Sequence, residues 1–132
     1  MFRKHFQFLF FLLVVAGAMA QNPKWKKWEV EADTLMNRQE FEKAINLYSK
    51  VIKTSKLNDK SAYSAVYKRA VCYYSVGNYQ AAVNDADTFL EEQPSLFQAH
   101  LLKAFIYRDM GDEENQLDAL NQALAIQPGD PG

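Results

Sequence analysis

Few residues in this chain could do chemistry, and their spacing does not favour catalysis. The histidines are His5 and His100, and the only cysteine is Cys72. A structural zinc site needs about four nitrogen or sulfur ligands, which this set cannot supply. Asp85 and Asp87 are two positions apart, so on a helix they point to different faces. The sequence also lacks a glycine-rich phosphate loop. We therefore predict a protein that is not an enzyme and binds no metal or other cofactor.

Cys72 lies between Val71 and Tyr73 in a segment that must be packed. A single cysteine excludes an internal disulfide. We expect a buried, inert thiol, because free cysteine behaves as a small hydrophobic residue. The alternative is a reactive or intermolecular cysteine.

The first 20 residues have the order of a secretory signal peptide. Arg3 and Lys4 precede an apolar run over 8–16, and Ala18 and Ala20 form a small-x-small site. We expect cleavage before Gln21 and an exported protein, located in the periplasm or cell envelope or secreted. The alternative is an uncleaved membrane anchor, although a spanning helix needs about 20 apolar residues.

The remaining chain of 112 residues has room for one small domain. Its 13 basic and 16 acidic residues give a net charge of −3. This balance argues against a nucleic-acid partner, which requires a basic face. Lys24, Lys26 and Lys27 are a local exception beside Trp28. We expect a solvated first turn with Trp28 pointing inward and no membrane contact after leader removal; the alternative is contact with a membrane surface.

Apolar residues beyond the leader recur at helical spacing, and no run alternates as a strand would. The pattern predicts helices over 25–38, 41–54, 61–76, 79–93, 96–110 and 113–127, and therefore an all-α fold. Gly77 and Gly111 can end a helix at positive φ, and Asn78 and Asp112 can cap the next helix. Such short turns place consecutive helices antiparallel.

The same residue types recur 34 positions apart. The pairs are Ala70 and Ala104, Tyr73 and Tyr107, Gly77 and Gly111, and Pro94 and Pro128. A period of about 20 to 50 residues is typical of stacked units that cannot bury their apolar faces alone. With Tyr79 and Ala82 in the second unit and Ala123 in the third, this pattern resembles the tetratricopeptide repeat.

A weaker first unit precedes these two. It contains Trp28, Ala32, Leu35, Phe41, Ala44 and Tyr48. Gln39 replaces the turn glycine, and Lys56 replaces the closing proline. This unit lies 38 residues upstream of the second, so about four extra residues fall within 55–60. A charged residue replaces the usual leucine of the motif in every unit: Glu31, Arg69 and Lys103.

The resemblance implies a right-handed helical-hairpin solenoid of three repeats and six helices. The predicted divisions are a signal peptide over 1–20, a linker over 21–24, repeats over 25–58, 63–96 and 97–130, and a tail over 131–132. Ala32, Ala70 and Ala104 should allow close helix approach. The facing side should be supplied by Ala44, Ala82, Phe89, Leu90, Leu120, Ala123 and Leu124.

In the family, the first helices of successive units line a concave groove that takes a segment of another protein. The resemblance and the helical phase assign partner-binding positions to Asp33, Met36, Asn37, Tyr67, Val71, Tyr74, Leu101, Phe105 and Arg108. Alternatively, Val71 and Phe105 pack between adjacent helices. Glu29 and Asp33 argue against a clamp for a partner's carboxylate. His100 stands where the repeat has a large residue, so we expect it to pack.

We therefore predict an exported, non-catalytic module that binds a protein or peptide in its concave groove. The alternative is a subunit that assembles with copies of itself through its last helix. No further helix follows 113–127, so Leu117, Leu120 and Leu124 should lack the cover that a next repeat provides.

Overall fold

The computed structural model describes residues 22–57, 59 and 62–126, and it contains six helices and no strand within them. The helices are α2 (Lys24–Asn37), α3 (Phe41–Ser55), α4 (Tyr63–Ser75), α5 (Tyr79–Glu92), α6 (Phe97–Met110) and α7 (Glu113–Ile126). Each of the six predicted helices is present, with its ends within two residues of the prediction. The all-α prediction is confirmed. The predicted signal peptide, Pro128 and the tail lie outside the described residues.

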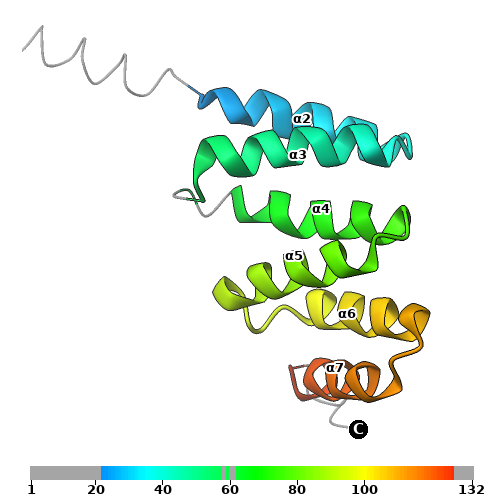
Figure 1. Ribbon diagram of the computed structural model, residues 1–132. Coiled ribbons are helices and arrows are strands. Elements are labelled where there is room, and N and C mark those ends of the chain that lie inside the picture. Colours follow the sequence, from blue (N-terminus) through cyan, green and yellow to red (C-terminus); the bar gives the residue numbers. More distant parts are fainter. Residues whose placement is uncertain (1–21, 58, 60–61, 127–132) are drawn as a thin grey trace, which may run out of the picture.

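The helices form three antiparallel hairpins stacked in chain order (Figure 1). These are α2 with α3, α4 with α5, and α6 with α7. Each helix packs on the next one in the sequence, and α4 also contacts α6. This arrangement follows from the short connections, which leave consecutive helices no room to separate.

The turns confirm the predicted glycine and capping roles. Gly77 and Gly111 have φ values of 78° and 75°. The Asn78 side chain accepts a hydrogen bond from the Ala81 backbone N–H, and Asp112 does the same for Asn115. Gln39, which stands in place of the missing glycine, also has a positive φ of 61°. The first hairpin therefore makes the same turn with a residue that tolerates it less well.

The connection between α3 and α4 contains the predicted extra residues. It spans 56–62, whereas the corresponding connection between α5 and α6 spans only 93–96. Lys56 and Leu57 both adopt positive φ, 51° and 55°, and they end α3 without a proline.

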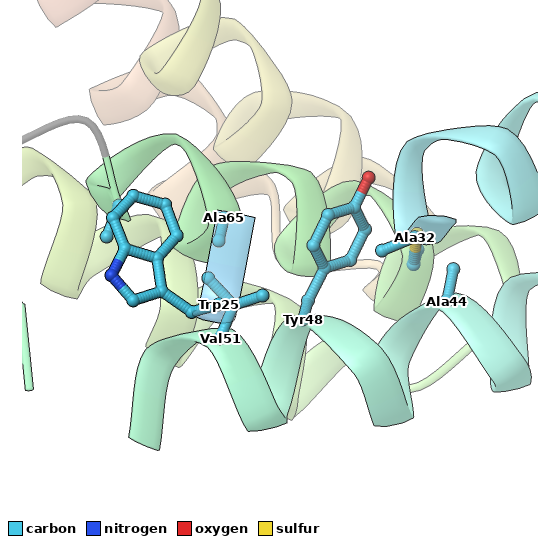
Figure 2. Packing of buried hydrophobic residues seen from close by; sticks show 8 residues of the cluster. Trp25, Ala32, Ala44, Tyr48, Val51 and Ala65 are labelled. Carbon is cyan, nitrogen blue, oxygen red and sulfur yellow. The ribbon is translucent and has the colours of Figure 1, made fainter. Parts of the chain in front are cut away.

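Small residues at the helix contacts form the centre of the stack. Ala32, Ala70 and Ala104 are fully buried, as predicted, and so are Ala44 and Ala82. In Figure 2 the Tyr48 side chain lies between that of Trp25 and those of Ala32 and Ala44.

Two of the predicted core positions differ in the structure. Trp28 does pack against the first cluster, but Trp25 is the more deeply buried of the two. Leu124, which was assigned to the core, is 68% exposed. It faces away from α6 because α7 buries its Ala119–Ala123 face instead.

Two of the charged residues at the motif's leucine position form ion pairs with α5. Arg69 donates to both carboxylate oxygens of Asp85, each at 2.7 Å, and to the Ser49 hydroxyl at 2.9 Å. Lys103 lies 2.7 Å from Asp87. As predicted, the two aspartates point to different faces: one pairs within its own hairpin and the other with the next hairpin.

Candidate functional site

The nine predicted partner-binding residues lie on α2, α4 and α6, the first helix of each hairpin. We call the surface that carries these nine residues the first-helix face. Hydrogen bonds join the three helices along this face: Ser64 to Glu29, Lys68 to Asp33, and Tyr74 to Asp109. The predicted residues therefore belong to one continuous surface.

At the α2 end of the first-helix face, Asp33 is engaged by other side chains of the chain. Its Oδ1 accepts a hydrogen bond from the Tyr48 hydroxyl at 2.6 Å, and Lys68 donates to both of its oxygens at 2.9 Å. Burial, followed by this carboxylate, raises the pKa of Tyr48. Met36 accepts a weak hydrogen bond from the same hydroxyl at 3.8 Å, while Asn37 is exposed. Asp33 and Met36 therefore tie α2 to its neighbours.

Glu29 is buried beside this network. Ser64 donates to it at 2.8 Å, Lys26 pairs with it at 2.8 Å, and Lys68 lies 3.8 Å away. Its charge is compensated inside the protein, as expected for a buried carboxylate.

The middle of the first-helix face has a shallow depression with an apolar base. The Tyr67 ring lies 5.4 Å from the Phe89 ring, and burial raises the pKa of the Tyr67 hydroxyl. The depression has a volume of about 310 Å³ and is lined by Tyr63, Ser64, Tyr67, Lys68, Phe89, Gln93 and Leu96. Val71 is partly buried against α6, in line with the alternative that it packs between helices. Tyr67 is therefore a wall residue with one free edge.

The α6 end of the first-helix face brings together an aromatic pair and an ion pair. The Tyr74 hydroxyl donates to Asp109 at 2.6 Å, and Arg108 donates to the other oxygen of Asp109 at 2.9 Å. The Arg108 guanidinium lies 5.2 Å from the centre of the Phe105 ring. The hydrogen bond from Tyr74, and then the one from Arg108, lowers the pKa of Asp109.

Phe105 is 40% exposed, so it does not follow the alternative of packing between helices. Leu101, one turn before it, is partly buried. An exposed phenylalanine with an arginine stacked on it and a tyrosine nearby presents the residue types that are enriched at protein interfaces. Tyr74, Phe105 and Arg108 are thus brought together, whereas Asp33 and Met36 lie at the other end.

Three residues that the sequence reasoning did not assign to the site bridge its helices: Ser64, Lys68 and Asp109. Each is 35 positions from its partner, about one repeat length. A search for complementary polar residues one repeat apart on successive first helices would have found them.

The two remaining chemically capable residues are packed. Cys72 is buried, and burial raises the pKa of its thiol to about 11, so the inert interpretation is confirmed. His100 is also buried, and its Nε2 lies 2.8 Å from the Pro94 carbonyl oxygen, to which an N–H there donates. Within 22–57, 59 and 62–126, no three His, Cys, Asp or Glu residues are grouped as metal ligands.

None of the helices that the structure describes is both long and apolar enough to cross a membrane.

Comparison with known proteins extends the likeness beyond the internal repeat. A family model for the Fis1 C-terminal tetratricopeptide repeat matches residues 64–115. The tetratricopeptide repeat and J domain-containing co-chaperone of Cryptococcus neoformans is 32% identical over 81 residues, which are 61% of this chain and 15% of that protein. The chain spans 10 to 28% of the length of the curated relatives it matches.

Solved structures share the fold. The Sgt2 tetratricopeptide-repeat domain from Aspergillus fumigatus superposes with a TM-score of 0.70 at 24% identity, covering 84% of this chain and 71% of that one. The Arabidopsis OM64 tetratricopeptide-repeat domain superposes with a TM-score of 0.71 at 16% identity, covering 81% and 85%. The chain has the all-α tetratricopeptide-repeat fold, and its sequence matches support its place in the tetratricopeptide-repeat family.

Proposed function

We propose that this chain is an exported, non-catalytic module that binds a segment of another protein on its first-helix face. Tetratricopeptide folds typically serve as interaction scaffolds, because stacked repeats offer an extended surface rather than an enclosed pocket. Export rests on the leader-like residues 1–20, and the partner segment rests on the residue types of the face.

The observation that carries this proposal is the group formed by Tyr74, Phe105 and Arg108. Phe105 remains exposed although apolar residues around it are buried. Asp109 holds Tyr74 and Arg108 in place, so a partner would meet side chains that are already ordered. Preorganised aromatic and arginine side chains lose little conformational entropy on binding and are frequent hot spots.

The test begins with affinity capture, using residues 21–132 as bait, from cells that produce the chain. Binding of a captured protein is then measured by calorimetry against Tyr74→Ala, Phe105→Ala and Arg108→Ala variants. We expect each substitution to weaken binding roughly 30-fold, equivalent to about 2 kcal/mol, with unchanged helicity by circular dichroism.

Glu91, which is exposed on the second helix α5, provides the control. Glu91→Ala should leave the affinity unchanged. If Glu91→Ala weakens binding while Tyr74→Ala does not, the partner uses another surface and the proposal fails.

A further inference from the structure

The two helices at the ends of the stack, α2 and α7, each expose a large apolar residue on the outer side (Figure 1). Val30 on α2 is 61% exposed. On α7, Leu117 is 61% and Leu124 is 68% exposed. Leu117 and Leu124 are seven positions apart, so they lie on the same side of the helix.

The internal repeat shows what normally covers the α7 positions. By the 34-residue period, Leu117 corresponds to Val83 of α5 and Leu124 corresponds to Leu90. Val83 is only 6% exposed and packs with Leu102 and Ile106 of α6. Leu117 therefore occupies a position that, one repeat earlier, receives the first helix of the next hairpin.

The same comparison identifies the matching face of α2. Ala32 corresponds to Ala104 of α6, an offset of 72 residues, so Val30 corresponds to Leu102 and Thr34 to Ile106. In α6, Leu102 and Ile106 are the residues that pack against α5. In α2 the corresponding Val30 and Thr34 are exposed.

Charge favours contact between these two faces. Residues 22–57 carry eight basic and five acidic side chains, a net charge of +3, and residues 97–126 carry two basic and five acidic, a net charge of −3. On the end helices, exposed Lys24, Lys27 and Arg38 flank the α2 face, and α7 contains Glu113 and Glu114 but no basic residue. Opposite charge on two faces of one molecule favours association of copies.

The polarity of the helices agrees with this pairing. In the α5–α6 contact, Ala99 near the start of α6 packs in the cluster to which Leu90 near the end of α5 belongs. By correspondence, Lys27 of α2 would meet the end of α7 near Leu124. A cation is favourable at a helix C-terminus because it compensates the exposed carbonyl groups.

We propose that copies of this chain associate end to end, with α7 of one copy packing on α2 of the next as α5 packs on α6. The partner for these faces is a second copy of the chain. Such a contact is heterologous, so each copy keeps one free α2 face and one free α7 face, and the assembly can lengthen.

Two surface substitutions test this in residues 21–132, which contain every described helix. Val30→Glu should block the α2 face, and Leu117→Glu should block the α7 face. Both positions are solvent-exposed, so circular dichroism should show unchanged helicity. We expect the light-scattering mass of the unmodified chain to rise with concentration, while each variant alone keeps the mass of one chain.

An equimolar mixture of the two variants gives the decisive result. Each variant retains one intact face, so the mixture should reach the mass of two chains and no more. Val76→Glu, a matched valine exposed at the turn between α4 and α5, should assemble like the unmodified chain.

Three outcomes would overturn the proposal. In one, the unmodified chain keeps the mass of one chain at about 1 mM, where any contact with a Kd below that value is populated. In another, Val30→Glu alone still associates, which would indicate pairing of α7 with α7. In the third, the unmodified chain associates but the mixture of variants does not.

Discussion

At the scale of single residues, the turn of the first hairpin is the position where the chain departs most clearly from its own repeat. Gln39 holds a left-handed conformation that Gly77 and Gly111 provide in the other two hairpins. A side chain makes this conformation unfavourable by about 1–2 kcal/mol, because Cβ approaches the following carbonyl oxygen. The cost is offset by the packing of α2 on α3.

Exchanging these residue types should move the stability in opposite directions. Gln39→Gly should raise the free energy of unfolding by up to about 1 kcal/mol, since the relief of strain exceeds the added entropy of the unfolded chain. Gly77→Ala should lower it by about 1 kcal/mol through φ alone, because an added Cβ meets nothing within 4 Å. Urea melts give both values. A destabilised Gln39→Gly chain would contradict the left-handed turn.

Cys72 offers a chemical measure of the same structure. Burial raises the pKa of its thiol to about 11, so the reactive thiolate is scarce in the folded protein near pH 8. We expect iodoacetamide to modify Cys72 slowly in native buffer and rapidly in urea at the same pH, as followed by mass spectrometry. Equal rates in the two conditions would show that Cys72 is accessible in the folded chain.

At the scale of helices, close approach depends on alanines at the contacts. Ala104 of α6 is fully buried. Ala104→Leu should therefore lower the free energy of unfolding by about 1–3 kcal/mol, because the extra volume forces neighbouring helices apart. Ala125→Leu, at an exposed position of α7, is the matched control and should change it little. Similar urea midpoints for the two variants would mean that α6 is rotated differently.

The two aspartates of α5 join different helices at different depths. Asp85 is nearly buried and paired through two hydrogen bonds with Arg69, whereas the Asp87 side chain is 50% exposed and paired with Lys103. Asp85→Ala should cost about 3 kcal/mol, because it leaves the Arg69 guanidinium without its partner. Asp87→Ala should cost less than about 1 kcal/mol. Thermal and urea melts would contradict this ranking if the two losses were equal.

At the scale of the whole molecule, a stack of hairpins has two ends and one long face, and each has a different proposed use. The first-helix face is proposed for a partner segment, and the ends are proposed for further copies of the chain. These uses are compatible because the first-helix face residues Tyr74, Phe105 and Arg108 lie on α4 and α6, away from the outer faces of α2 and α7.

The leader determines where this assembly would operate. We expect the chain to be cut after Ala20 when it is exported, because its apolar run is short and ends in a small-x-small site. Intact mass spectrometry of the exported protein should give a chain that begins at Gln21. Recovery of the full-length chain from membranes would instead support the anchor alternative.

The amino-acid sequence by itself determined the six helices, their turns and the buried alanines. These features depend on local preferences and on a period that repeats along the chain: a glycine at positive φ, an asparagine or aspartate cap, and a small residue at each close approach. They were therefore predictable at Gly77, Asn78 and Ala104. The nine positions of the first-helix face were placed on the right helices for the same reason.

Only the tertiary structure decided which polar residues meet and which apolar residues stay uncovered. Lys68 joins Asp33, and Tyr74 joins Asp109, because of the rotation between neighbouring hairpins, which helical periodicity within one segment does not specify. Leu124 reads as core in a helix taken alone, yet it is exposed because α7 buries its alanine face. A side chain's burial depends on what is stacked next to it, and that is a property of the assembled hairpins.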